Sequence, residues 1–172
     1  ETRQLIRIIP LLLDLGESYA PYNFSWVVEN QLAAMAWPET EGNLNFLWQN
    51  GIKHVVTLSP EKVPPIANSK LEWTLIPVEE FEPPTLDNMI TFINICETSL
   101  AKKESVGVHC RMGRGRTGVM AACFLVHFLG LRPETAVYNL RCWRPGSVET
   151  YGQERAVVEY HDYLRGTKTN AS

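Results

Sequence analysis

Short apolar segments alternate with longer amphipathic ones along most of the chain. Apolar residues at 26–28 and 32–34 predict two short paired strands, and the runs at 52–58, 71–76 and 106–109 predict three more strands. Helical spacing predicts helices from about residue 40 to before Gly51, from 85 to about 103, from 133 to 143 and from 150 onward. Residues 117–129 are apolar almost all round, which is typical of a central packed helix. This alternation predicts one α/β domain whose central, twisted, mostly parallel sheet carries helices on both faces.

Composition narrows the class of protein without identifying it. With 172 residues, 45% of them hydrophobic, the chain can bury one core without disulfides or a structural metal. A net charge of −3 argues against a general nucleic-acid binder, so we expect no nucleic-acid partner. Cys96, Cys110, Cys123 and Cys142 are not closely paired, which indicates a reducing compartment, the cytoplasm or the nucleus.

The ends of the chain carry no recognisable chemistry. The apolar run at 5–15 is shorter than the ~20 residues that span a bilayer, and Arg7 and Pro10 interrupt it, so we expect no stable membrane insertion. We assign residues 1–22 to an N-terminal extension of unknown role and residues 166–172 to a flexible tail.

The candidate chemistry lies between residues 109 and 118. The expected strand at 106–109 runs directly into a glycine-bearing loop that opens the most apolar helix. Such a junction gathers unpaired backbone N–H groups around one point, with the positive end of the helix dipole behind them. It predicts a site for a tetrahedral dianion, formed by Arg111, Met112, Gly113, Arg114, Gly115 and Arg116.

The side chains of this loop predict nucleophilic catalysis. The positive electrostatic potential that binds the dianion also favours the thiolate form of Cys110. The planar guanidinium of Arg116 can hold two phosphate oxygens. We expect His109 to orient the loop and Thr117 to donate a hydrogen bond to the sulfur when it leaves. None of these steps needs a metal or another cofactor. Taken singly, Cys110 and His109 are also compatible with ordinary buried structural residues.

The order His-Cys, five residues, Arg-Thr-Gly resembles the signature loop of the protein-tyrosine and dual-specificity phosphatases. Residues 23–26, 106–110 and 144–151 further resemble the small atypical dual-specificity phosphatases of the VHZ type, a likeness that covers about residues 23–165. The resemblance implies a metal-free protein-tyrosine-phosphatase-like catalytic domain. It implies hydrolysis of phosphotyrosine, and by extension of phosphoserine and phosphothreonine, in proteins through a phosphocysteine at Cys110.

The proton donor is where the sequence departs from this family. The family places an Asp on a loop facing the phosphate site, whereas residues 76–84 contain none. The Phe and the double proline that follow put Glu80 at the acid position. Glu79 and then Asp87 are the alternatives, and the three glutamates of this loop can also be a merely solvated acidic stretch.

The second step needs a group that orients water, and Glu149 and Gln153 are the candidates. Each has a structural alternative. Thr150 and Gln153 have the spacing of a helix capping box, and Glu149 can cap that helix or pair with Arg141 or Arg144.

Arg111 and Arg114 are cations that a simple phosphate site does not require. At these two positions the loop is similar to that of phosphatases of phosphoinositides and inositol phosphates, which implies a multiply anionic substrate as an alternative to a phosphoprotein. The alternative is that both arginines are solvated and only raise the local positive potential, without binding a further phosphate. Two further hypotheses remain: a pseudophosphatase that binds phosphate without turnover, and a sulfurtransferase, which would not require Arg116 and Thr117.

Overall fold

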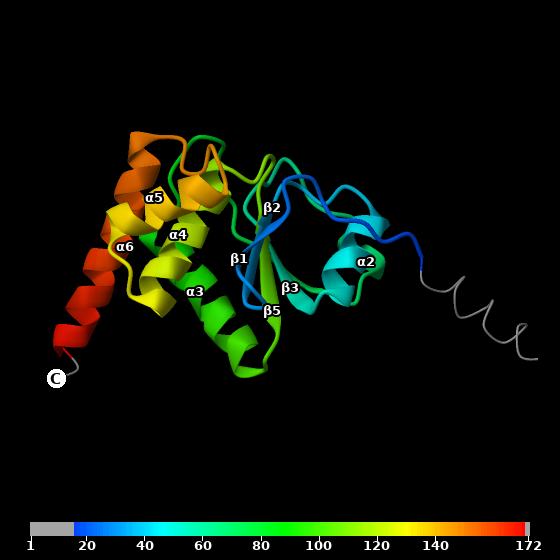
Figure 1. Ribbon diagram of the computed structural model, residues 1–172, viewed down its shortest axis with the longest axis horizontal. Coiled ribbons are helices and arrows are strands. Elements are labelled where there is room, and N and C mark those ends of the chain that lie inside the picture. Colours follow the sequence, from blue (N-terminus) through cyan, green and yellow to red (C-terminus); the bar gives the residue numbers. More distant parts are fainter. Residues whose placement is uncertain (1–15, 171–172) are drawn as a thin grey trace, which may run out of the picture.

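The computed structural model describes residues 16–170, which form one sheet with helices on both sides (Figure 1). The sheet order is β1–β2–β5–β3–β4. The strands are β1 (Ser25–Val28), β2 (Leu32–Met35), β3 (Ile52–Thr57), β4 (Glu72–Leu75) and β5 (Ser105–His109). Only β1 and β2 pair antiparallel, and the other three pairs are parallel, which confirms the predicted mostly parallel sheet.

The helices divide unequally between the two faces of the sheet. Helix α2 (Glu41–Gln49) covers one face, and the larger helical layer covers the other (Figure 1). That layer contains α3 (Leu86–Ala101), α4 (Gly115–Leu129), α5 (Pro133–Trp143) and α6 (Tyr151–Asn170). Side chains alternate across β2 as strand geometry requires: Leu32 and Ala34 join the core beneath α3 and α4, whereas Ala33 and Met35 join the core beneath α2.

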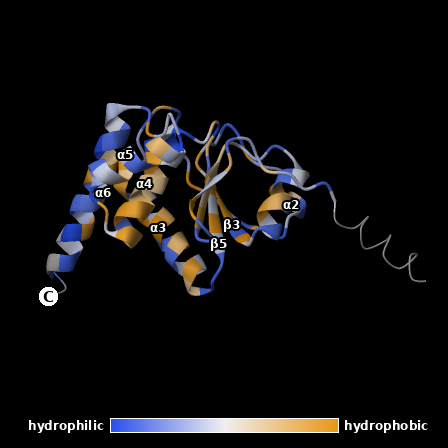
Figure 2. Cartoon of the chain, viewed as in Figure 1, coloured by the Kyte–Doolittle hydropathy of each residue, from blue (hydrophilic) through white to orange (hydrophobic). Residues whose placement is uncertain are grey.

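Helix α4 is the central helix, and every residue from Gly115 to Val126 is buried. It is coloured as hydrophobic over most of its length, whereas α6 shows a largely hydrophilic outer surface (Figure 2). The helix begins earlier than the expected Thr117. Its first turn starts inside the loop itself, because the backbone N–H of Gly118 already donates to the carbonyl of Arg114 at 2.8 Å.

The last helix has the predicted cap and a longer body. The N–H of Gln153 donates to Thr150 Oγ1 (3.1 Å), and the N–H of Thr150 donates to Gln153 Oε1 (3.2 Å), as in a capping box. Helix α6 continues to Asn170, into the segment expected to be a tail. No proline interrupts it there, and a single glycine, Gly166, weakens a helix by only about 1 kcal/mol.

Residues 1–15, with the apolar run at 5–15, lie outside the described residues. The remainder of the expected extension packs along α2: Asn43 Nδ2 donates to the carbonyl of Tyr19 (3.1 Å), and Asn45 Nδ2 donates to that of Glu17 (3.2 Å). Within residues 16–170, no helix combines the length and apolarity that a membrane crossing requires.

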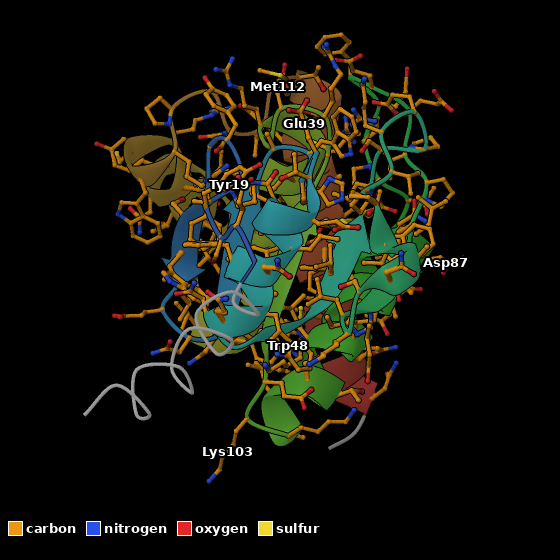
Figure 3. All side chains as sticks on the ribbon, turned by 90° about the vertical axis from the view of Figure 1, so that its right-hand side faces the viewer. Tyr19, Glu39, Trp48, Asp87, Lys103 and Met112 are labelled. Atoms are coloured by element: carbon orange, nitrogen blue, oxygen red, sulfur yellow. The ribbon has the colours of Figure 1, made fainter. Side chains whose placement is uncertain are left out.

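The connections between strands change faces of the sheet at the carboxyl end of β5. The β2–α2–β3 connection crosses on one face, whereas β4–α3–β5 returns on the other, with β5 between β2 and β3. In open α/β sheets, ligands bind beyond the carboxyl ends of the strands at such a reversal. Met112, just past β5, lies at one end of the molecule, and Lys103, just before β5, lies at the other (Figure 3).

Candidate active site

The loop between β5 and α4 turns its carbonyl groups away from the pocket. The donors to these carbonyls are His109 Nδ1 for Cys110 (3.1 Å), the backbone N of Trp37 for Arg111 (3.2 Å), Asn23 Nδ2 for Met112 (3.0 Å), Arg144 Nη2 for Gly113 (2.8 Å) and the backbone N of Gly118 for Arg114 (2.8 Å). In a trans peptide the N–H of the next residue points the opposite way. The N–H groups of residues 111–115 are therefore directed toward the pocket, as an anion site requires.

Two glycines of this loop are needed for different reasons. Gly113 has φ +73°, and a Cβ there would lie 2.5 Å from the backbone carbonyl of Met35 at the end of β2. The φ of Gly115 is not in the positive range, but a Cβ at this position would lie 2.6 Å from Glu149 Oε1 and 3.0 Å from Gln153 Nε2. Gly113 thus permits the turn, and Gly115 permits the close approach of Glu149.

Cys110 lies at the bottom of a small pocket of about 140 Å³ and is only 3% exposed. The other residues lining this pocket are Glu80, Phe81, Arg111, Met112, Arg114, Arg116 and Glu149. The structure therefore brings the predicted nucleophile, the predicted acid, the phosphate-site arginines and one of the two water-positioning candidates into one cavity.

Arg116 is buried and held by a partner that sequence reasoning missed. Its Nη2 donates to Glu61 Oε1 at 2.7 Å, and its Nη1 donates to Glu61 Oε2 at 3.2 Å and to the carbonyl of Val78 at 2.8 Å. The hydrogen bond from Arg116 lowers the pKa of the Glu61 carboxyl. The only sequence signal for Glu61 is its place in the loop after β3. This loop follows the carboxyl end of its strand, as the phosphate loop does after β5.

His109 is fully buried, and its hydrogen bonds assign its tautomer. Trp73 Nε1 donates to Thr57 Oγ1 (2.8 Å), so the Thr57 hydroxyl is free to donate to His109 Nε2 (2.6 Å). Nδ1–H then donates to the carbonyl of Cys110. Burial lowers the pKa of His109 to about 4, so the ring is neutral at physiological pH. These contacts are those of a residue that orients the loop.

The hydroxyl of Thr117 is buried and has no hydrogen-bond partner among the described residues. Buried polar groups without a partner are rare and call for an explanation. An unused donor in the first turn of α4, beside the phosphate loop, agrees with the expectation that Thr117 assists the leaving sulfur, which remains a prediction.

Glu80 lies at the pocket rim, but its carboxylate is already engaged. Oε1 accepts a hydrogen bond from Arg111 Nε at 3.0 Å and pairs with Arg111 Nη2. The alternatives lie elsewhere: Glu79 does not line the pocket, and Asp87 occupies the first turn of α3, away from Met112 (Figure 3). For Glu80 to serve as proton donor, its pair with Arg111 must loosen.

The two water-positioning candidates differ in their surroundings. Glu149 lines the pocket, whereas Gln153 is fully buried behind it, accepting from the N–H of Glu149 (2.7 Å) and donating to the carbonyl of Glu82 (3.3 Å). The suggested pairing of Glu149 with Arg141 or Arg144 is wrong. Arg141 pairs with Glu154, and the Arg144 guanidinium donates only to neutral oxygens.

The two extra arginines of the loop are not equivalent. Arg111 is neutralised by Glu80, whereas Arg114 has no ion pair or side-chain hydrogen bond within the described part of the chain. The aliphatic stem of Arg114 lies near Gly146, where a Cβ would come within 3.3 Å of Arg114 Cδ. Arg114 therefore presents an uncompensated cation at the rim.

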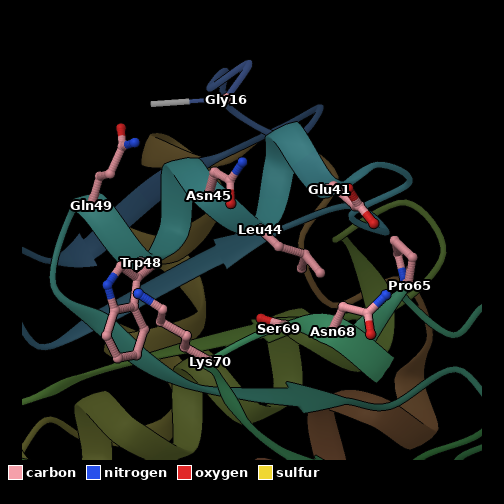
Figure 4. A pocket seen from close by; sticks show the side chains of 10 residues that line it. All are labelled: Gly16, Glu41, Leu44, Asn45, Trp48, Gln49, Pro65, Asn68, Ser69 and Lys70. Atoms are coloured by element: carbon pink, nitrogen blue, oxygen red, sulfur yellow. The ribbon is translucent and has the colours of Figure 1, made fainter. Parts of the chain in front are cut away.

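A larger hollow of about 310 Å³ lies between α2 and residues 65–70 (Figure 4). It is lined by Leu44, Trp48 and Lys70 among others, and it contains none of the loop residues. No cysteine or histidine lines it. Among residues 16–170, no three His, Cys, Asp or Glu side chains gather in a way that could hold a metal ion. The cavity that combines a nucleophile with converging donors is thus the smaller one at Cys110.

Comparison with curated proteins gives a sequence relative. Protein tyrosine phosphatase domain-containing protein 1 of Bos taurus is 28% identical over 163 residues, covering 81% of this chain. The chain spans only about a fifth of the length of this relative. The specific likeness to the VHZ type remains a prediction.

Solved structures show the same fold. Tk-PTP in its active form superposes with a TM-score of 0.74 at 23% identity, covering 81% of this chain and 97% of Tk-PTP. PTPMT1 in complex with PI(5)P superposes with a TM-score of 0.77 at 18% identity, covering 84% and 98%. The predicted phosphatase-like architecture is therefore confirmed.

The family itself is given by a domain model. The model of the DSP-PTPase phosphatase domain of the Swiss Army Knife type (PTP-SAK) matches residues 21–157. This range contains every strand of the sheet and the whole loop from Cys110 to Arg116. The chain belongs to the DSP-PTPase family of phosphatase domains.

Proposed function

We propose that this chain hydrolyses phosphate monoesters through a phosphocysteine on Cys110. The observation that carries the proposal is the pocket in which Cys110 meets the inward N–H groups of the loop and the guanidinium of Arg116. This combination offers one nucleophile and a ring of donors for three phosphate oxygens.

In the first step the Cys110 thiolate attacks phosphorus and the ester P–O bond breaks. The departing oxygen takes a proton from Glu80, which leaves a phosphocysteine and a Glu80 carboxylate. Arg116 and the loop amides hold the three equatorial oxygens throughout. Glu61 and Val78 keep the fork of Arg116 in place before substrate arrives, which reduces the reorganisation needed in the transition state.

In the second step a water molecule attacks phosphorus and the S–P bond breaks. Glu80, now a carboxylate, takes the proton of this water, and Thr117 donates a hydrogen bond to the thiolate that forms. Glu149 is the better candidate to orient the water, because it lines the pocket and Gln153 is committed to backbone groups. Inorganic phosphate then leaves.

A phosphoprotein is the substrate that the pocket supports best. The cavity is small, about 140 Å³, and Phe81 stands 55% exposed at its rim, where it can pack against a phosphotyrosine ring. The name of the bovine relative points the same way. A site of this size also admits phosphoserine and phosphothreonine.

Steady-state hydrolysis of p-nitrophenyl phosphate and of phosphotyrosine peptides tests the function. We expect turnover without added metal and inhibition by vanadate, which imitates the phosphoryl group in this loop. Vanadate binding without any turnover would instead identify a pseudophosphatase, and persulfide transfer without phosphatase activity would identify a sulfurtransferase.

Replacing Glu80 with Gln tests the proton donor. We expect kcat/KM for an alkyl phosphate to fall about 10²-fold, because an alkoxide leaves poorly without a proton. The kcat/KM for p-nitrophenyl phosphate should change little, because its phenolate leaves unaided. The two substrates are compared by kcat/KM because this ratio reports only formation of the phosphocysteine and excludes the role of Glu80 in the second step.

Glu79→Gln is the matched control, since it removes the same charge from the same loop outside the pocket. It should leave both rates unchanged. Equal losses on both substrates in Glu80→Gln, or a selective loss in Glu79→Gln, would remove Glu80 from the mechanism.

A second candidate substrate class is polyphosphorylated inositol, free or in a lipid head group. The uncompensated Arg114 at the rim favours it, because a second phosphate can pair with Arg114 without breaking an existing ion pair. PTPMT1, which shares this fold, was solved with PI(5)P bound. Arg111 can contribute only after it leaves Glu80.

We expect Arg114→Ala to raise the KM for an inositol polyphosphate about tenfold, while the KM for a monophosphate stays within about twofold. The double replacement of Arg111 and Arg114 should widen this gap. Arg132→Ala is the control, because it removes the same charge from an exposed position paired with Glu134, outside the pocket. If the KM changes equally for both substrates, Arg111 and Arg114 only raise the local positive potential and do not bind a second phosphate.

A further inference from the structure

Arg144, at the end of α5, lies buried behind the phosphate loop and is only 4% exposed. Its Nη1 donates to the carbonyl of Asn23 (2.7 Å), the hydroxyl of Ser25 (2.6 Å) and the carbonyl of Ala34 (3.2 Å). Its Nη2 donates to the carbonyl of Gly113 (2.8 Å). One guanidinium thus ties the loop to β1 and β2.

All of these acceptors are neutral, and no carboxylate pairs with Arg144 within residues 16–170. A buried cation without an anionic partner is costly. Burial lowers the pKa of Arg144 to about 10, so the side chain still carries its charge at neutral pH. The fold therefore maintains a desolvated positive charge directly behind the loop, and hydrogen bonding alone does not require that charge.

The anion that this positive charge can stabilise is the thiolate of Cys110, on the pocket side of the loop. Cys110 faces the pocket from the same loop whose Gly113 carbonyl accepts from Arg144, and a negative charge on its sulfur would oppose the effect of burial on the pKa of Arg144. The hydrogen bond to the Gly113 carbonyl also fixes the peptide unit whose N–H, that of Arg114, points into the pocket.

We propose that Arg144 is a positioning residue of the proposed phosphatase reaction: from outside the pocket it holds the peptide between Gly113 and Arg114 with its N–H toward the phosphate, and its charge stabilises the Cys110 thiolate. The proposal rests on the proposed function for its catalytic meaning. Arg144 itself does not line the pocket and touches no substrate.

Other charged groups also act on Cys110 and must stay constant in a test. Arg111, Arg114 and Arg116 belong to the loop and the first turn of α4, Glu80 comes from the loop before α3, and Glu149 from the loop before α6. His109 is neutral because its pKa is lowered to about 4. Replacing Arg144 leaves all of these in place.

The test is the rate of alkylation of Cys110 by iodoacetamide as a function of pH, followed on the Cys110 peptide by mass spectrometry in the full chain. In Arg144→Met, which keeps the length and removes the charge, we expect the midpoint of this profile to rise by about one pH unit. In Arg144→Lys the midpoint should stay near that of the parent protein, whereas vanadate affinity should fall about tenfold because the fork that holds Gly113 is lost.

Ser25→Ala is the matched control, because it removes one hydrogen bond of Arg144 and keeps its charge. Its alkylation midpoint should not move. An unchanged midpoint in a folded Arg144→Met protein, judged by its thermal unfolding, overturns the proposal. If that variant does not fold, Arg144→Lys decides, and an unchanged vanadate affinity there overturns the proposal as well.

Alkylation needs no turnover, so this test is separate from the test of function. A parent protein that hydrolyses no monoester refutes the phosphatase reaction, whereas the midpoints still report whether Arg144 stabilises the thiolate.

Discussion

Replacing Cys110 with Ser is expected to lower the hydrolysis of p-nitrophenyl phosphate by about 10⁴-fold or more, to the background rate. The reason is chemical. A serine hydroxyl remains protonated at neutral pH in the same field that favours a thiolate, and it leaves far less readily in the second step. The measurement is kcat at saturating substrate for the parent protein and the variant, with intact mass confirming the replacement.

The structure provides a matched comparison in Cys142, which is exposed and lies on α5 outside the pocket. Cys142→Ser should retain full activity. Cys110→Ser should still bind inorganic phosphate, because its loop amides and Arg116 remain in place. Residual turnover above about 1% of the parent rate would mean that the reaction does not pass through Cys110.

Residues that act together in this site were predictable to the extent that they are adjacent in sequence. Cys110, Arg116 and the glycines between them occupy one strand–loop–helix junction, so the local order of residue types already predicts their convergence. His109 was predictable for the same reason, since it ends β5. The sequence does not predict its partner Thr57 on β3, nor Trp73 on β4, which donates to Thr57.

The residues behind the loop could not be read from the sequence. Asn23, Trp37 and Arg144 hold its carbonyls from three separate segments, and each contact depends on how the chain returns to the loop. The sequence suggests Arg144 as a partner for Glu149 and as the first residue of the stretch 144–151 that carries the family resemblance, but not as a contact of the loop. Periodicity gave no hint that it points toward β1 and β2, because it lies just beyond the end of α5.

The fold was more predictable than its details. Alternating strands and helices are sufficient for an α/β sheet, because each element must bury one apolar face. The hydrophobic pattern predicts that α4 starts at Thr117, because the loop residues before it are polar, whereas Gly115 and Arg116 already belong to the helix. Here the requirement to direct a helix N-terminus at the pocket outweighs the hydrophobic pattern.

Replacing Arg116 with Lys is expected to lower kcat for a phosphate monoester by about 10²- to 10³-fold, although the charge is kept. In the parent protein Arg116 is anchored by Glu61 and Val78 with one planar group that can also face the phosphate. A lysine ammonium is a single point with three donors, so it cannot hold two phosphate oxygens and keep both anchors. The loss should therefore fall on kcat more than on KM.

Glu61→Gln separates the anchoring of the Arg116 guanidinium from its contact with the phosphate. It keeps an oxygen acceptor for the guanidinium but removes the charge that anchors it, so we expect kcat to fall about tenfold, less than in Arg116→Lys. The lowered pKa of Glu61 indicates that this carboxylate is ionised throughout the neutral range, so the difference should not depend on pH between about 6 and 8. An Arg116→Lys protein within tenfold of the parent would show that charge alone suffices. Equal losses in both variants would instead mean that Arg116 acts chiefly through its position, which Glu61 sets.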